Sequence, residues 1–134
     1  MGTIRTLNDI RVWHLSRRLT KEIYRISGTS FRNDDPLRNQ IRRASASIVS
    51  NIAEGFERNG NKEFLQFLSH AKGSTGEVLA QLTMAFDLGY CDEDTFWCVR
   101  SMAIQILQML ERLMSYLRDT EILGRKFKTT TLPR

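Results

Sequence analysis

Residues that interrupt helices are scarce in this chain of 134 residues, which contains two prolines and eight glycines. Proline cannot continue the hydrogen bonding of a helix, and glycine in a helix interior costs about 1 kcal/mol relative to alanine. Their scarcity therefore permits long helices almost everywhere. Hydrophobic residues make up 41% of the chain, which is enough for one core, and the length suits a single domain.

Cysteine and histidine are equally rare, with two of each. Cys91 and Cys98 do not have a CxxC spacing, and we expect free thiols rather than a disulfide. His14 and His70 cannot assemble a Ser/His/Asp or Cys/His site, and the Glu-x-x-His pairs of di-iron bundles do not occur. No phosphate-binding glycine loop is found either. The sequence therefore predicts no catalytic residue, no metal site, no cofactor and no small-molecule substrate; we do not expect an enzyme.

Long apolar runs do not occur in the sequence. No stretch reaches about 18 apolar residues, the length that a membrane-spanning helix needs. The residues after Met1 do not form the apolar run of a signal peptide. We therefore expect a cytoplasmic protein without a membrane partner.

Charge is distributed unevenly along the chain, whose net charge is +5. Residues 1–60 carry 11 Lys/Arg and 6 Asp/Glu, residues 61–120 carry 5 and 8, and residues 121–134 carry 4 and 1. We predict one helical domain over residues 1–120 and a basic, flexible tail over residues 121–134. The polarised domain either attracts another subunit or presents a cationic face to an anionic partner.

Four helices are predicted from apolar residues that recur every three or four positions. Asp9 is the expected N-cap of the first helix, and the second starts at Asp34 or Asp35 with Pro36 in its first turn. Gly28 and Gly89 are the expected stops. The expected ranges are 9–27, 34–58, 61–89 and 92–119. Because the links between them are short, we predict an all-α fold, an antiparallel up-down-up-down four-helix bundle.

The last helix carries the widest apolar surface. Its seam follows a heptad-like spacing through Phe96, Val99, Ala103, Ile106, Leu110, Leu113 and Leu117. A second row lies beside this seam and consists of Met102, Met109 and Tyr116. One interpretation is a deeply buried helix. The other, which we adopt as a hypothesis, places this second row at an interface between subunits.

Polar residues form a further stripe on the second and third helices. Antiparallel helices joined at Asn59-Gly60 bring together residues whose numbers sum to about 120, because the rise per residue is the same in both. We therefore predict a structural polar seam inside the bundle, made of Gln40, Arg43, Ser47, Asn51, Glu54, Gln66, His70, Gly73, Glu77 and Gln81. The expected contacts include an Arg43–Glu77 ion pair and a close approach of Ser47 to Gly73.

A cationic row follows the first helix beside its apolar stripe. Its members are Arg11, His14, Arg18, Lys21 and Arg25, and Arg17 widens the row. Such a row can follow a phosphate backbone without reading its sequence, and Trp13 beside it can stack on a base. The alternatives are a solvated helix face, a contact with the acidic half of another subunit, and a Trp13 that packs between helices.

Three motifs occur in order along these helices: QIRRA at 40–44, SNIAEG at 50–55 and LGY at 88–90. On these motifs, residues 7–118 resemble the four-helix bundle family named for proteins encoded in intervening sequences of bacterial 23S rRNA genes. The resemblance implies a ring-shaped assembly, often a pentamer, and no catalytic residue. One branch, the accessory variability protein of diversity-generating retroelements, binds a reverse transcriptase and nucleic acid. That branch is far more basic than residues 1–120 here, whose net charge is +2 from 16 Lys/Arg and 14 Asp/Glu.

Two hypotheses about function follow from these patterns. The first is a non-enzymatic bundle that self-assembles and binds RNA or a nucleoprotein partner through the cationic row. The second is an oligomeric scaffold that has no nucleic-acid role. Salt-dependent binding of generic RNA distinguishes the two.

Overall fold

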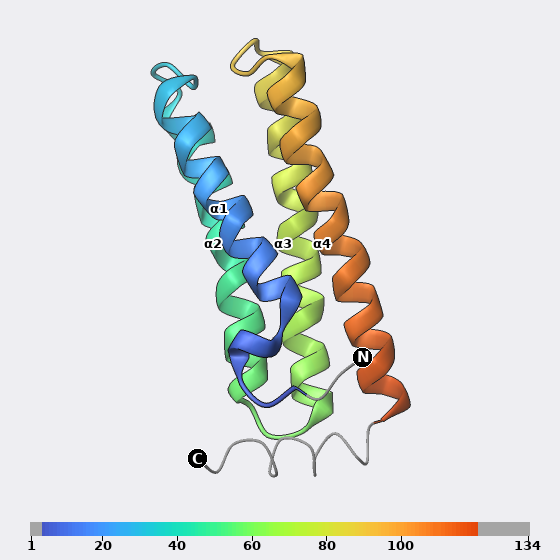
Figure 1. The fold of residues 1–134 in the computed structure, drawn as a ribbon. Coiled ribbons are helices and arrows are strands. Elements are labelled where there is room, and N and C mark those ends of the chain that lie inside the picture. The colour runs from blue at the N-terminus through green and yellow to red at the C-terminus, as the bar shows by residue number, and fades with distance from the viewer. Residues whose placement is uncertain (1–3, 121–134) are drawn as a thin grey trace.

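The computed structural model describes residues 4–120, and these residues form four long helices. They are α1 (Arg11–Thr29), α2 (Asp35–Glu57), α3 (Asn61–Asp87) and α4 (Glu93–Asp119), preceded by the short 3-10 helix η1 (Leu7–Asp9). Successive helices run in opposite directions, and α4 returns to pack against α1 (Figure 1). The prediction of an antiparallel four-helix bundle is confirmed, while the predicted basic tail at 121–134 lies outside the described residues.

Local capping contacts fix most helix ends where the sequence predicts them. Asp34 caps α2 by accepting a hydrogen bond from the Leu37 amide at 3.1 Å, and Asp92 caps α4 through the Thr95 amide at 2.7 Å. These bonds satisfy amides that have no partner inside the helix. The hydrogen bond from the Thr95 amide also holds the pKa of Asp92 below its usual range.

The end of α3 is a Schellman motif built around Gly89. This residue has φ +79°, a left-handed conformation that glycine adopts without steric cost. The Gly89 amide donates to the carbonyl of Phe86 at 3.0 Å, and the Tyr90 amide donates to that of Ala85 at 2.8 Å. The predicted stop at Gly89 is therefore confirmed.

Both predicted ends of α1 are wrong by a few residues. Asp9 caps η1 instead, because its carboxylate accepts from the amides of Thr6 and Arg5 at 2.9 and 2.7 Å. These bonds lower the pKa of Asp9. At the other end, α1 continues through Gly28, and the Ser30 amide still donates to the carbonyl of Ile26 at 2.9 Å. Gly28 is therefore helical rather than a stop.

The core extends through the length of the bundle and uses the predicted stripes. On α4, every residue of the predicted seam is buried, from Phe96 to Leu117. On α2, Ile41, Ile48 and Ile52 have no exposed surface. The largest fully buried side chains include Phe31, Phe56 and Phe64, so aromatic rings fill space where the helices are joined as well as between them.

Helices α2 and α3 have the expected register. Phe56 packs edge-to-face on Phe64 with ring centroids 6.2 Å apart, and the Ser47 and Ser74 hydroxyls are 2.9 Å apart. The residue numbers of both pairs agree with the predicted sum. The two helices pack tightly at Gly55, where a Cβ atom would lie 2.7 Å from the Cβ of Phe67.

Candidate nucleic-acid interface

Helix α1 presents the predicted cationic row on the face opposite its buried stripe. Val12, Leu19, Ile23 and Ile26 point into the core. The exposed members of the row are Arg11, Arg17, Arg18, Lys21 and Arg25, while His14 is half-buried. The helix contains one carboxylate, Glu22. The structure thus brings the predicted residues to one cationic surface, which we call the α1 cationic face.

His14 is held through both of its ring nitrogens. The guanidinium of Arg17 lies 3.3 Å from Nδ1 of His14, and Nε2 lies 2.8 Å from the carbonyl oxygen of Asn8. A guanidinium has only donors and a carbonyl only accepts, so Nδ1 faces a donor and Nε2 faces an acceptor. His14 therefore fixes the start of α1 and orients Arg17.

Trp13 packs rather than presenting a free stacking surface. The Arg17 guanidinium lies 4.7 Å from the centroid of its ring, and the side chain packs against the core. Its indole nitrogen is buried and has no hydrogen-bond partner among the described residues. Between the two fates considered for Trp13, the structure favours the contact between helices.

Arg25 is partly neutralised by the single carboxylate of α1. Its guanidinium donates to Glu22 at 2.6 Å. The hydrogen bond from Arg25 lowers the pKa of the Glu22 carboxyl, and the same bond raises the pKa of Arg25. Both side chains therefore stay charged at neutral pH, and their charges offset each other.

Arg11, Arg18 and Lys21 remain as the unpaired cations of the α1 cationic face. Within residues 4–120 these three side chains form no hydrogen bond and no ion pair. They span about 15 Å along the helix axis, given a rise of 1.5 Å per residue. On the neighbouring helix α4, the exposed residues between Thr95 and Leu110 are all uncharged: Trp97, Cys98, Ser101, Gln105 and Gln108.

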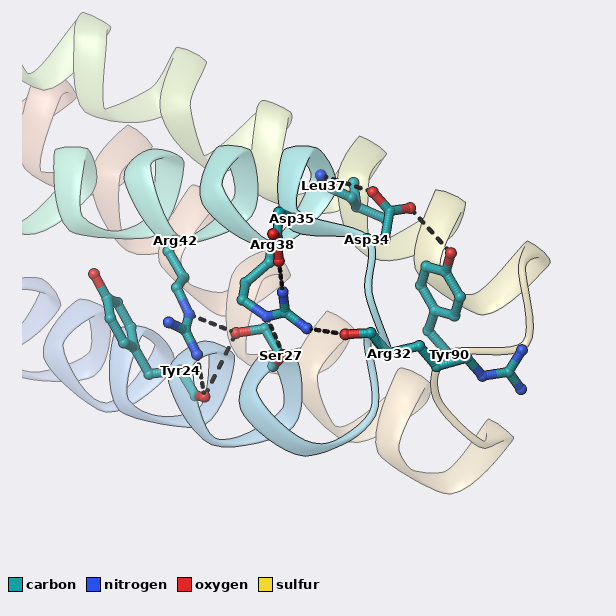
Figure 2. Close-up of polar contacts among 9 residues, drawn as sticks. All are labelled: Tyr24, Ser27, Arg32, Asp34, Asp35, Leu37, Arg38, Arg42 and Tyr90. Carbon is teal, nitrogen blue, oxygen red and sulfur yellow. Dashed lines mark hydrogen bonds and ion pairs between the residues drawn. The ribbon is translucent and has the colours of Figure 1, made fainter.

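Two further arginines, which the sequence patterns did not single out, bind the C-terminal end of α1 (Figure 2). Arg38 donates to the carbonyl oxygen of Ser27 at 2.8 Å and also to that of Arg32, and it forms an ion pair with Asp35. Arg42 donates to the Ser27 hydroxyl at 2.8 Å. Cations at a helix C-terminus are favourable for its dipole and for its unpaired carbonyls. The spacing of Arg38 and Arg42 could have indicated this contact, since they are four residues apart on the side of α2 that faces α1.

The predicted polar seam is mostly a solvent-exposed surface. Gln40, Arg43, Glu54, Gln66, His70, Gly73 and Glu77 are exposed, and only Ser47, Asn51 and Gln81 are half-buried. Among the ion pairs of residues 4–120 there is none between Arg43 and Glu77, so that prediction is wrong. Glu54 pairs with Arg58 of its own helix at 2.8 Å instead of meeting Gln66.

The small polar contact inside this surface is displaced by one residue from the prediction. Ser47 meets Ser74 rather than Gly73, and Asn51 donates to the Ser47 carbonyl and hydroxyl at 2.8 and 3.0 Å. A Cβ atom at Gly73 would have nothing within 4 Å, so the predicted close approach there is also wrong. A shift of one residue turns a side chain by about 100° around the helix, which moves it from the interface to solvent.

The predicted oligomer row of α4 lies at the edge of the core. Met102, Met109 and Tyr116 are half-buried and pack against the bundle's own core. The most exposed large apolar side chains of the described chain are others: Tyr24, Met84, Leu88 and Trp97. All four lie close to the same end of the bundle, where the α1–α2 and α3–α4 connections meet (Figure 1).

Residues 4–120 contain no group of three or more His, Cys, Asp or Glu residues that could hold a metal ion. Cys91 and Cys98 are free thiols, and burial raises the pKa of Cys91. In the same part of the chain, no helix is both long enough and apolar enough to span a bilayer.

Comparisons with known proteins agree with this architecture. The family model described as 23S rRNA-intervening sequence protein matches residues 8–112. Among solved structures, the chain is similar to a protein with unknown function from the S23 ribosomal protein family of Bacteroides thetaiotaomicron VPI-5482. The TM-score is 0.71 at 19% identity, over 77% of this chain and 97% of that one, and a likeness at this identity shows the fold alone. No curated protein matches the chain.

Proposed function

Since the chain belongs to the 23S rRNA-intervening sequence protein family, we propose that it is a non-enzymatic bundle that binds RNA through the α1 cationic face and assembles with copies of itself. The observation that carries the RNA proposal is the set of three unpaired cations, Arg11, Arg18 and Lys21, on one exposed face. The family's description makes RNA the nucleic acid to test first. A cytoplasmic location is part of this proposal.

Binding on this face is electrostatic and does not read sequence. Exposed Lys and Arg side chains replace counterions on the phosphate backbone, so affinity falls as salt rises. Three to four phosphate contacts per chain give only weak binding to RNA. Assembly into a ring, with five subunits expected from the family resemblance, would repeat the face several times and raise the overall affinity through multivalency.

The test of the RNA proposal is equilibrium binding of a generic RNA at two salt concentrations, measured by fluorescence anisotropy. The wild type is expected to bind, with an affinity that falls with salt. Replacing Arg11, Arg18 and Lys21 together by Ala should weaken binding and flatten the salt dependence, by about one unit of log–log slope for each phosphate that is no longer neutralised.

A matched control carries the same type of change on other faces. Arg43, Lys62 and Arg112 are exposed cations that form no ion pair within the described residues. Replacing these three by Ala removes charge without touching α1 and should change binding far less. No salt-dependent binding by the wild type, or equal losses in both variants, would contradict the proposal.

The second candidate is an oligomeric scaffold with no RNA partner. The observation that favours it is the half-buried apolar row of Met102, Met109 and Tyr116 on α4. Such a surface suits contact with another subunit. The scaffold candidate predicts self-assembly together with an absence of RNA binding, so the anisotropy measurement separates the two candidates.

A further inference from the structure

We propose that the RNA bound by the α1 cationic face is single-stranded and that one of its bases stacks on the ring of Tyr24. This inference rests on the proposed function of that face. Tyr24 belongs to the helix that carries the cationic row, and its side chain is 46% exposed. Its hydroxyl forms no hydrogen bond within residues 4–120.

The ring of Tyr24 is held from the side of α2 by an anchored arginine (Figure 2). The Arg42 guanidinium lies 4.5 Å from the ring centroid. Arg42 itself is fixed by its bond to the Ser27 hydroxyl at 2.8 Å and by a bond to the carbonyl oxygen of Tyr24 at 3.2 Å. An aromatic ring that is held in place before binding loses little conformational freedom when a base stacks on it.

Tyr24 also lies beside cations that are free to contact phosphate. Lys21 precedes it by three residues and is therefore its neighbour on the helix surface. Arg18, which is also unpaired, lies about one further turn toward the start of α1 and is exposed. A base stacked on Tyr24 would thus have its own backbone close to the unpaired Lys21 ammonium. Basic grooves that bind single strands combine these same elements, an aromatic platform and neighbouring cations.

A nucleic-acid base can stack on a side chain only if one face of the base is not already covered by a neighbouring base. In a duplex each base is stacked between its neighbours, so a double-stranded RNA would offer only its phosphates to this surface. A single strand can place a base on Tyr24 and keep the phosphate contacts. The geometry therefore favours single-stranded over double-stranded RNA, without a preference for one base, because every base has an aromatic face.

The experiment compares a short unstructured RNA with the duplex formed by the same strand and its complement. Both are titrated with the full chain and with the variants Tyr24→Leu and Tyr24→Phe. Leucine keeps an apolar group beside Arg42 but has no ring, whereas phenylalanine keeps the ring. Trp97→Ala is the matched control, because Trp97 is 53% exposed and lies 5.4 Å from Arg100 but belongs to α4.

We expect the wild type to bind the single strand more tightly than the duplex. Tyr24→Leu should weaken single-strand binding about fivefold or more, which is the range for losing one stacked base, and should leave duplex binding and its salt dependence unchanged. Tyr24→Phe and Trp97→Ala should retain wild-type affinity. Thermal unfolding of each variant shows whether the bundle is intact.

Two failures can be told apart. If both RNAs bind in a salt-dependent manner but Tyr24→Leu has no effect, or weakens both equally, the stacking inference is wrong and the cationic face stands. If the wild type binds neither RNA, the proposed function fails and the stacking inference fails with it. A loss of single-strand binding in Trp97→Ala equal to that in Tyr24→Leu would also overturn the assignment to Tyr24.

Discussion

At the residue scale, two glycines of the α2–α3 pair, Gly55 and Gly73, differ in how closely other atoms pack against them. Gly55 lies where α2 approaches α3, and a Cβ atom there would meet the Cβ of Phe67 at 2.7 Å and a ring carbon of Phe64 at 3.0 Å. Gly73 lies on the exposed side of α3, with nothing within 4 Å. The helix pair requires the first glycine for packing and gains no packing from the second.

We therefore predict opposite effects of alanine at these two positions. Gly73→Ala should raise the free energy of unfolding by about 0.5–1 kcal/mol, because alanine has the higher helix propensity. Gly55→Ala should lower it by about 1 kcal/mol or more, because the added methyl overpacks a close interface. Urea denaturation of the two variants beside the wild type measures both changes. The same sign for both variants would contradict the assignment of Gly55 as the close-packed glycine.

At the element scale, the position of α1 depends on the arginines of α2. The carbonyl of Ser27 belongs to the last turn of α1 and has no partner within the helix. Arg38 supplies one, and Arg42 adds contacts to the Ser27 hydroxyl and the Tyr24 carbonyl (Figure 2). These bonds attach the end of the helix that bears the cationic face to the beginning of the next helix.

Removing the Arg38 clamp should destabilise the bundle. We expect Arg38→Ala to lower the free energy of unfolding by about 1–3 kcal/mol, since the variant has no charge-assisted bond to the Ser27 carbonyl. Arg38→Lys should recover only part of this stability, because an ammonium cannot reproduce the forked contacts of a guanidinium. The measurement is chemical denaturation monitored by circular dichroism.

Arg43→Ala is the control for this change, since Arg43 lies on the same helix, is exposed and forms no ion pair within the described chain. Its effect should stay within about 0.5 kcal/mol. If Arg43→Ala and Arg38→Ala were equally destabilising, loss of charge rather than loss of the clamp would explain both.

The two loops at one end of the bundle are also joined to each other. The Tyr90 hydroxyl donates to Asp34 at 3.0 Å, while the other carboxylate oxygen of Asp34 caps α2. The hydrogen bond to Asp34 raises the pKa of Tyr90. Tyr90 therefore stays protonated at neutral pH and connects the α3–α4 loop to the start of α2.

At the scale of the whole molecule, the proposed self-assembly depends on the apolar row of α4. The predicted row of Met102, Met109 and Tyr116 is half-buried, and the exposed residues of α4 around it are uncharged as far as Leu110. A half-buried apolar row of this kind is suited to subunit contact.

We predict that the full chain is an oligomer in solution. Multi-angle light scattering should give a mass that is a multiple of 15.6 kDa, and five subunits is the number that the family resemblance implies. Met109→Lys places a charge in the row and should shift the mass toward the monomer. Unchanged helicity by circular dichroism is the control for folding. A monomeric wild type would contradict the assembly part of the proposed function.

Features that depend on short segments could be predicted from the sequence. The start of α2 at Asp34 or Asp35, the stop at Gly89, the buried stripes and the register of α2 against α3 each follow from local geometry or from a constant helical rise. The ends of α1 were misplaced because Asp9 has a nearer use in η1, and because one glycine in a helix costs only about 1 kcal/mol, which the packing of α1 offsets at Gly28. The α1 cationic face was predicted in its members but not in its pairing, since Arg17 and Arg25 have partners on their own helix.

The sequence by itself determined that this chain forms four helices, where most of them end, and which residues they bury, because these depend on contacts a few residues apart and on hydrophobic spacing. Only the tertiary structure decided which polar residues meet across the bundle. Each residue is rotated by about 100° from the next, so a shift of one position moves Gly73 to solvent and brings Ser74 to Ser47. The tertiary structure also decided that Arg38 and Arg42 bind the end of α1, whereas Arg11, Arg18 and Lys21 stay unpaired. The reason is that a long side chain pairs only with the groups that the neighbouring helix places within its reach.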